Sequence, residues 1–294
     1  MPARLAAVLL AALALAACGG GGEPAAEPPA PGATGAEPAE GEARDPGPLH
    51  VHGLGPDGSG GLLVATHSGL FRAADGGLER IGETIQDLMG FTVAGDGMLL
   101  ASGHPDTEEA QAQALPPHLG LIRSTDGGEM WEPVSLEGEA DFHALRAYGE
   151  LLYGFDASGG RLLASGDGGE TWEERELPGL LADLVADPAD AERLVAAGER
   201  GVVRSEDGGR SWEGLAERIG LLAWPEGGPI YLVDAEGAIH TSRDGQGWRR
   251  VGETGEPPAA LVAVGPRELY FAGHDGDILG SEDGGRTWTP FASF

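Results

Sequence analysis

A short string recurs along this chain of 294 residues at a nearly constant spacing. It reads STDGGEMW at 124–131, SGDGGETW at 165–172, SEDGGRSW at 205–212 and SEDGGRTW at 281–288, with a shortened copy, SRDGQGW, at 242–248. A degenerate copy without the tryptophan, AADGGLER, stands at 73–80. The repeated aspartates are Asp75, Asp126, Asp167, Asp207, Asp244 and Asp283. Six copies of a string about forty residues apart predict six equivalent structural units.

Each unit is a series of short apolar runs separated by Gly, Asp and Pro. Examples are a first run at Phe142–Ala147, a second at Leu269–Ala272 and a third at Val202–Arg204, while a fourth begins at each tryptophan. Such short runs without a helical period are typical of β-strands. Four short strands per unit, repeated six times, predict an all-β fold: a six-bladed β-propeller of four-stranded antiparallel blades.

The repeated string itself predicts a tight turn between the third and fourth strands. Its aspartate can accept hydrogen bonds from backbone N–H groups of the turn, and its glycines permit positive φ. We expect its tryptophan in the groove between blades, which assigns a structural role to Trp131, Trp172, Trp212, Trp248 and Trp288. The arginines that precede the string, Arg72, Arg123 and Arg204, repeat with it and are interpreted in the same way.

The pattern S-x-D-x-G-x-x-W resembles the Asp box of bacterial neuraminidase repeats, over residues 50 to 294. That resemblance implies a propeller in which the box lies on the outer part of each blade. It carries little information on function, because sialidases, sortilin-type receptors and photosystem II assembly factors share it. The segments HVHGL, ATHSGLFR, QDLMGF and DFHAL together resemble bacterial lipoproteins labelled glycosyl hydrolase or sialidase-like.

The amino terminus has the features of a targeting segment. Residues 1–17 hold Arg4 followed by an apolar stretch too short to span a bilayer, which predicts a signal peptide. The sequence Leu15-Ala16-Ala17-Cys18 resembles the lipobox of bacterial lipoproteins, and this resemblance implies lipidation of Cys18, the only cysteine. The alternative is an ordinary secretory peptide with an incidental cysteine. Residues 18–47, rich in Gly, Pro, Ala and Glu, predict a disordered tether, and residues 48–294 the propeller.

The charge of the chain limits its partners. The formal net charge is −30, and arginine supplies every basic side chain, since the sequence has no lysine. Such a surface repels phosphate backbones and argues against a nucleic-acid partner. We expect a monomer attached by its N-terminal lipid to the outer side of a bacterial membrane, at the cell surface or in the periplasm.

Six of the eight histidines fall at two equivalent places in the units. His50, His52 and His143 stand at the start of a first strand, as does Met89. The ends of the second strands carry His67, His104, Asp156, Glu199, Asp234 and His274. In a four-stranded blade both places lie on one face, near the central channel. His118 belongs to an insertion, HPDTEEAQAQALPPHLG at 104–120, which opens on the same face.

This concentration leaves three interpretations open. Turns are polar, so the histidines can be ordinary turn residues. They can also line a pocket for a polar ligand or partner protein. The third interpretation is a metal site, because the spacing of His50 and His52 puts both rings on one side of a strand. With a third imidazole such a pair binds Zn²⁺ or Cu²⁺, and the predicted ligands are His52, His67 and His143.

An enzyme is the rival class of function. The Asp-box resemblance suggests a sialidase-like glycoside hydrolase, whose family uses an arginine triad and a Tyr/Glu nucleophile pair. The string LFRAAD at 70–75 lacks the Ile-Pro of the sialidase Phe-Arg-Ile-Pro motif, and Arg146 has no evident partners for a triad. The catalytic residues therefore stay unassigned. The prediction is a binding propeller, with a hydrolase or a membrane-protein assembly factor as the alternatives.

Overall fold

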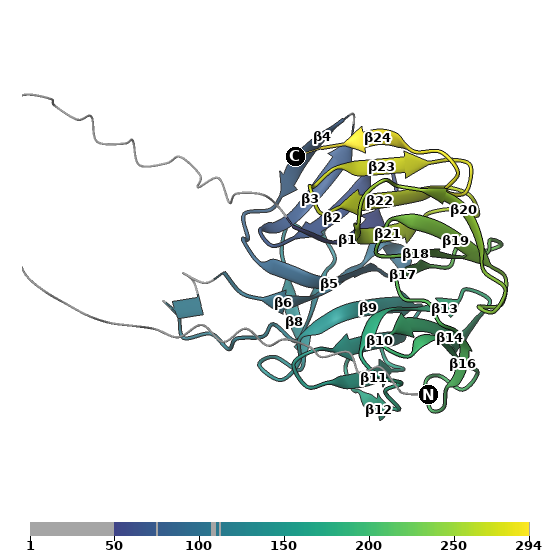
Figure 1. The fold of residues 1–294 in the computed structure, drawn as a ribbon. Coiled ribbons are helices and arrows are strands. Elements are labelled where there is room, and N and C mark those ends of the chain that lie inside the picture. Colours follow the sequence, from purple (N-terminus) through teal and green to yellow (C-terminus); the bar gives the residue numbers. More distant parts are fainter. Residues whose placement is uncertain (1–49, 75, 107–109, 112, 294) are drawn as a thin grey trace, which may run out of the picture. The chain divides into compact units, whose positions relative to one another are not determined.

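The computed structural model describes residues 50–293, except residues 75, 107–109 and 112 (Figure 1). The predictions for the signal peptide at 1–17, for the tether at 18–47 with Cys18, and for Asp75 concern residues outside those described. Within the described part, no helix is both long and apolar enough to cross a membrane.

The chain forms six antiparallel sheets of four strands each, as predicted, and no strand is exchanged between sheets. Blade 1 holds β1 (Val51–Pro56), β2 (Leu62–Thr66), β3 (Gly69–Ala74) and β4 (Gly77–Ile81). Blade 2 holds β5 (Asp87–Val93), the 3₁₀ turn η1 (Gly95–Gly97), β6 (Leu99–His104), β7 (Leu121–Ser124) and β8 (Glu132–Ser135). Blade 3 holds β9 (Phe142–Tyr148), β10 (Leu151–Asp156), β11 (Arg161–Ser165) and β12 (Glu173–Arg175).

The second half repeats this arrangement. Blade 4 holds β13 (Leu181–Asp187), β14 (Asp190–Gly198), β15 (Gly201–Ser205) and β16 (Glu213–Ala216). Blade 5 holds β17 (Leu221–Ala223), β18 (Ile230–Val233), β19 (Ala238–Ser242) and β20 (Arg249–Glu253). Blade 6 holds β21 (Pro258–Ala263), β22 (Leu269–Gly273), β23 (Ile278–Ser281) and β24 (Thr289–Ala292). The observed architecture is a six-bladed β-propeller.

The core is divided among the junctions between blades. Phe142 of blade 3 is fully buried against Leu100 and Leu121 of blade 2, and Trp172 packs on the same cluster. The indole Nε1 of Trp172 donates to Ser135 of blade 2. Each blade therefore buries its faces against its two neighbours, because a single four-stranded sheet cannot bury both faces alone.

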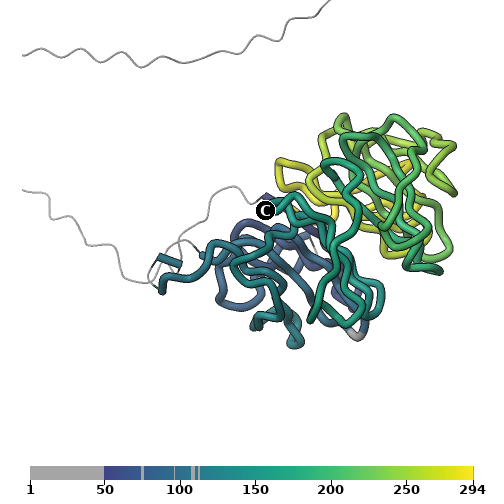
Figure 2. Tube along the Cα trace, turned by 90° about the horizontal axis from the view of Figure 1, so that it is seen from below, coloured from purple at the N-terminus to yellow at the C-terminus, as the bar shows by residue number. Residues whose placement is uncertain are grey.

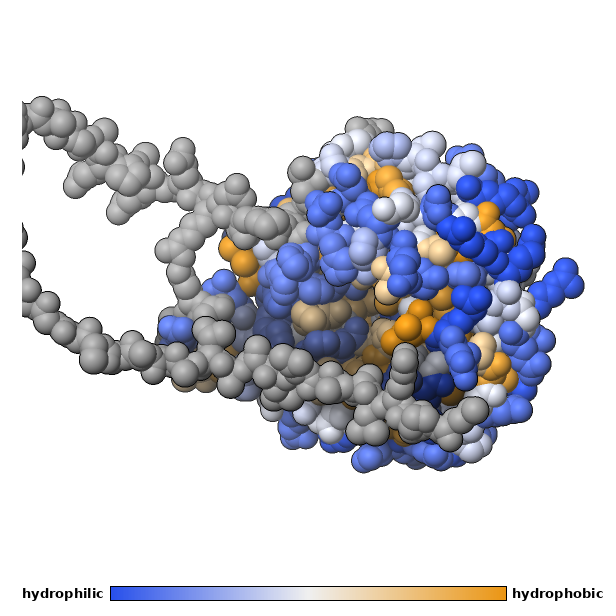
Figure 3. Space-filling model, viewed as in Figure 1, coloured by the Kyte–Doolittle hydropathy of each residue, from blue (hydrophilic) through white to orange (hydrophobic). Residues whose placement is uncertain are grey.

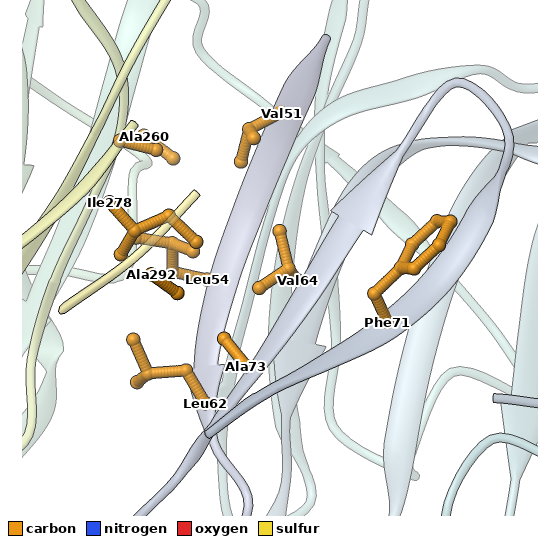
Figure 4. Packing of buried hydrophobic residues seen from close by; sticks show 10 residues of the cluster. Val51, Leu54, Leu62, Val64, Phe71, Ala73, Ala260, Ile278 and Ala292 are labelled. Carbon is orange, nitrogen blue, oxygen red and sulfur yellow. The ribbon is translucent and has the colours of Figure 1, made fainter. Parts of the chain in front are cut away.

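The ring closes by packing of blade 6 on blade 1. Val51, Leu54 and Val64 of blade 1 share one buried cluster with Ala260 and Ile278 of blade 6 (Figure 4). Yellow β24 runs beside blade 1 in Figure 1, and the last segments also lie next to the first ones in Figure 2. One isolated bridge joins Gly76 to Ala292. Closure thus comes from packing of blade 6 against blade 1, with four consecutive strands in every blade.

The turn between the third and fourth strands has the same hydrogen bonds in five blades. In blade 3, the Ser165 hydroxyl donates to Asp167 Oδ1 at 2.7 Å and accepts the N–H of Gly169 at 2.9 Å. Asp167 also accepts the N–H and the hydroxyl of Thr171. Ser124, Ser205, Ser242 and Ser281 donate in the same way to Asp126, Asp207, Asp244 and Asp283. These aspartates satisfy backbone donors of their own turns.

Candidate functional site

A β-bulge stands near the start of the first strand in five blades, and in blades 4 and 6 the extra residue is an alanine, Ala182 or Ala259. The pairing register shifts between Val51 and Gly53 in β1, and between Leu88 and Gly90 in β5. An equivalent shift in β9 leaves His143 without a partner residue. A bulge turns the extra side chain away from the regular alternation. The extra residues in blades 1, 2 and 3 are His52, Met89 and His143, and all three line a central cavity of about 480 Å³.

Three side chains from blades 1 and 2 converge beside this cavity, and His52 is the one that lines it. Nε2 of His52, in β1, lies 3.2 Å from Nδ1 of His67, which follows β2. Asp87, the first residue of β5, places Oδ1 3.3 Å from His52 Nε2 and Oδ2 2.9 Å from His67 Nδ1. The ring of His50 packs on that of His67 with centroids 5.1 Å apart. We call His52, His67 and Asp87 the first histidine site.

The three separations match those between ligands of a tetrahedral metal ion. Zn²⁺ bonds to imidazole nitrogen and carboxylate oxygen are about 2.0–2.1 Å long, so the edge of the tetrahedron is about 3.3 Å. The observed separations are 3.2, 3.3 and 2.9 Å. Three protein ligands would leave one position of a tetrahedral ion for water or a bound molecule.

The protonation of Asp87 agrees with this arrangement. Burial raises the pKa of the Asp87 carboxyl, but hydrogen bonds from His52 and His67 outweigh burial and lower that pKa. Asp87 is therefore a carboxylate at neutral pH, the form that binds metal. Its buried Oδ1 lies 3.3 Å from His52 Nε2 and has no other hydrogen-bond partner in the described structure.

A second group lies one blade further along, at the junction of blades 2 and 3. It combines His104 at the end of β6, His118 from the segment between β6 and β7, and Asp141 immediately before β9. One ligand atom from each lies within 4.8 Å of the others. His118 is fixed through its neighbours, since Leu119 N donates to Gly103 and Gly138 N donates to the carbonyl of His118. We call this trio the second histidine site.

His143 contacts the second site from the cavity side. Its Nε2 lies 3.0 Å from Asp141 Oδ2. This hydrogen bond raises the pKa of the His143 imidazole, against the opposing effect of burial, and the negative charges of Asp141 and Asp87 add to the rise. The predicted metal trio of His52, His67 and His143 is thus divided between the two sites.

The two sites are neighbours on the cavity rim. Asp87 of the first site and His104 of the second are directly paired across β5 and β6. Directly paired residues on antiparallel strands have Cβ atoms about 4.5–5.5 Å apart. The first three blades therefore carry a continuous arc of imidazoles and carboxylates.

The other predicted rim residues lie elsewhere. Asp156 is fully buried, and it binds Arg161 at 2.6 Å and accepts the N–H of Asp141. Glu199 caps its own loop by accepting the N–H of Leu180. Asp234 accepts the N–H of Ala238 and binds His240 at 2.9 Å. His274 is exposed. The structure brings none of these four into either histidine site.

Three site residues were not among the predicted site residues: Asp87, Asp141 and His118. The signal for the two aspartates is present in the aligned strings QDLMGF and DFHAL, where Asp holds the place of the first histidine of HVHGL. His118 carries no such signal, because it reaches the site through an insertion with no counterpart in the other units.

The cavity has one arginine among the described residues that line it, Arg146. Its Nη2 donates to Asp183 Oδ1 at 2.6 Å, and Asp183 also accepts the N–H groups of Leu184 and Leu222. Burial raises the pKa of Asp183, and Arg146 opposes that rise. The hydroxyl of Tyr148 accepts the N–H of Ala186. Arg146 is therefore paired between blades 3 and 4, and Asp183 extends the contact to blade 5.

Comparison with solved structures places the fold among β-propellers. A GH74 enzyme of Niastella koreensis superposes with a TM-score of 0.60 at 15% identity over 82% of this chain, which spans 45% of the length of that enzyme. A chain of a nidogen/laminin complex superposes with a TM-score of 0.60 at 14% identity. The match covers 79% of this chain and 93% of that chain. A catalytically inactive virginiamycin B lyase from Staphylococcus aureus, solved with quinupristin, superposes with a TM-score of 0.55 at 13% identity. The match covers 83% of this chain and 85% of the lyase.

These identities establish the fold alone. The sequence matches no protein-family profile and no curated protein. The class that the fold defines is the six-bladed β-propeller, and His52 and His143 are the histidines among the described residues that line its central cavity.

Proposed function

We propose that this protein binds a divalent transition-metal ion, Zn²⁺ or Cu²⁺, at the first histidine site. The observation that carries the proposal is the convergence of His52, His67 and Asp87 at 3.2, 3.3 and 2.9 Å. Two imidazoles and one carboxylate suit both ions. Met89 lines the same cavity, and its thioether would favour copper.

The surroundings of the site support cation binding. A net charge of −30 attracts cations to the whole surface and raises their local concentration. Hydrophilic residues dominate the face drawn in Figure 3, with smaller hydrophobic patches between them. The open coordination position would allow a small molecule in the cavity to complete the shell of the ion.

We further propose that the propeller is held outside the cytoplasm by a lipid on Cys18, following the lipobox-like sequence Leu15-Ala16-Ala17-Cys18. Recovery in the membrane fraction that is lost in Cys18→Ser would support this anchor. Recovery of Cys18→Ser in the membrane fraction at the level of the natural chain would contradict it.

A glycoside hydrolase is the weaker candidate. It is supported by the structural likeness to the GH74 enzyme, at an identity that establishes fold only. A sialidase-like site needs several inward arginines, whereas Arg146, the one arginine among the described residues of the cavity wall, is paired with Asp183.

A protein client is the other candidate, because exposed apolar side chains precede several first strands. Ile85, Leu180 and Ile219 are exposed to 46%, 63% and 50% and stand before β5, β13 and β17. They lie on loops that enter the first strands, on the same face as the histidines.

Calorimetric titration of the metal-free, full-length chain with Zn²⁺ and with Cu²⁺ tests the proposed function. We expect saturable binding, and in His67→Ala the affinity of the first site should fall at least about a hundredfold, because one of its three ligands is removed. His67 is exposed to 47%, so its replacement leaves the fold intact.

His274→Ala is the matched control, since it removes an exposed imidazole from the same face and from neither site. We expect it to bind metal as the natural chain does. Equal binding by His67→Ala and the natural chain would refute the assignment of the first site.

A further inference from the structure

The second histidine site has a carboxylate that is almost entirely buried. The Asp141 side chain is 7% exposed, compared with 22% for Asp87 in the first site. Asp141 Oδ2 lies near two imidazoles, 3.0 Å from His143 Nε2 and 3.5 Å from His104 Nε2. Its Oδ1 is buried and has no hydrogen-bond partner in the described structure. An unpaired buried carboxylate oxygen is costly, so a cation at this place would stabilise the fold.

The hydrogen bond of His104 fixes which of its nitrogens carries a proton. Nδ1 lies 2.9 Å from the carbonyl oxygen of Pro117, and a carbonyl can only accept, so Nδ1 must be the donor. In the neutral imidazole, Nε2 then holds a lone pair. That lone pair faces Asp141 Oδ2, so two acceptors face each other. Either a proton or a metal ion must lie between them.

This arrangement is also the usual environment of a metal-bound histidine. The ring nitrogen away from the ion commonly donates to a backbone carbonyl, which fixes the orientation of the ring and its tautomer. Pro117 provides that carbonyl for His104. The next residue, His118, has a buried Nδ1 with no hydrogen-bond partner among the described residues. Its ring lies 5.4 Å from that of His104, centroid to centroid.

We propose that His104, His118 and Asp141 bind a second divalent transition-metal ion, independently of the first site. The two sites share no ligand, so a substitution in one removes no ligand of the other. Imidazole and carboxylate ligands in this number suit Zn²⁺ and Cu²⁺. His143 is bonded to Asp141 and would orient the carboxylate.

The repeat explains why there are two such sites. Each site combines a histidine at the end of a second strand, His67 or His104, with an aspartate at the start of the next first strand, Asp87 or Asp141. At the following three junctions the residues equivalent to Asp87 and Asp141 are Leu180, Gly220 and Pro257, none of which is acidic. The sixth junction pairs His274 with His50 and has no aspartate at this place.

The number of metal ions bound per chain tests the proposal. We would saturate the full-length, metal-free chain with Zn²⁺, remove the unbound ion and measure zinc by mass spectrometry. The expected result is two ions for the natural chain and one for His118→Ala. His67→Ala, altered in the first site, should also keep one. The double variant should bind none. The control His274→Ala should bind two ions, as the natural chain does.

The outcomes separate the two proposals. One ion in the natural chain, kept in His118→Ala and lost in His67→Ala, would overturn the second site and leave the first intact. The reverse pattern would overturn the first site alone. Asp141→Asn, which keeps the shape of the side chain and removes its charge, gives an independent test. It should lose the same ion as His118→Ala, and circular dichroism of both metal-free variants would show whether the fold is retained.

Discussion

The role of a buried or half-buried aspartate in this protein depends on the side chains that face it. Asp87 and Asp141 face imidazoles and are suited to metal, whereas Asp183 faces the guanidinium of Arg146. Asp183 accepts hydrogen bonds from Arg146 in blade 3, from Leu184 in its own strand and from Leu222 in blade 5. One buried side chain thus connects three blades around the cavity.

Asp183→Ala should lower the free energy of unfolding by about 2–3 kcal/mol, because it removes the partner of Arg146 and an acceptor of two buried N–H groups, those of Leu184 and Leu222. This loss is at or below the low end of the range of about 3–5 kcal/mol for breaking a buried ion pair, because the Arg146 side chain is 26% exposed. Urea denaturation would measure it. Glu206→Ala, which removes an exposed partner of Arg193, should cost about 0.5 kcal/mol. Equal losses in both variants would show that the Asp183 contacts contribute no more than a surface pair.

At the scale of the element, the turns between third and fourth strands depend on ionised aspartates. Hydrogen bonds from the hydroxyl and N–H of Thr171, and from Ser165, lower the pKa of Asp167 to about 2. Ser211 and Ser205 lower the pKa of Asp207 to about 2 in the same way. The ordinary value is 3.8. The folded state therefore binds fewer protons than the unfolded state between these two pH values.

The stabilisation from these turns should be complete above about pH 4 and lost as the pH falls towards 2, because the folded pKa is the lower one. Asp167→Asn removes the carboxylate, so the decline in its stability between about pH 4 and 2 should be less steep. Thermal melts across this range would measure the difference. Glu170→Gln removes an exposed charge from the same turn and should keep the natural slope. An unchanged slope in Asp167→Asn would contradict the prediction.

At the scale of the whole molecule, the ring is closed by side chains of its first and last blades. Val51, Leu54 and Val64 meet Ala260 and Ile278 in the buried cluster of Figure 4. No strand of the described chain is shared between the first and last sheets. Stability of the closed ring should therefore be sensitive to this one apolar contact.

Ile278→Ala should lower the free energy of unfolding by about 3 kcal/mol, because it removes buried methyl groups and leaves a cavity. Ile278 is 0% exposed, whereas Ile219 is 50% exposed. Ile219→Ala should change stability by less than about 0.5 kcal/mol. Urea denaturation of the two variants makes the comparison. A loss below about 1 kcal/mol in Ile278→Ala would mean that closure does not depend on this cluster.

The sequence by itself determined the number of blades and the strands within them. The repeated Ser, Asp and Gly act within a few residues of each other, and the observed fourth strands begin one residue after Trp131, Trp172, Trp212, Trp248 and Trp288. Local hydrogen bonds and the alternation of apolar side chains carry that information along the chain.

Only the tertiary structure decided which rim residues meet. Sequence equivalence predicted His52, His67 and His143 as one set, but contacts form across blade junctions, between the end of one unit's second strand and the start of the next unit's first. Bulges in β1, β5 and β9 turn three side chains into the cavity, and an insertion brings in His118. Asp234 occupies an equivalent place and satisfies its own loop instead, whereas Asp156 lies one position earlier in the strand register and bonds the turn that follows it. Such choices depend on distances between residues far apart in the chain, which local sequence patterns do not encode.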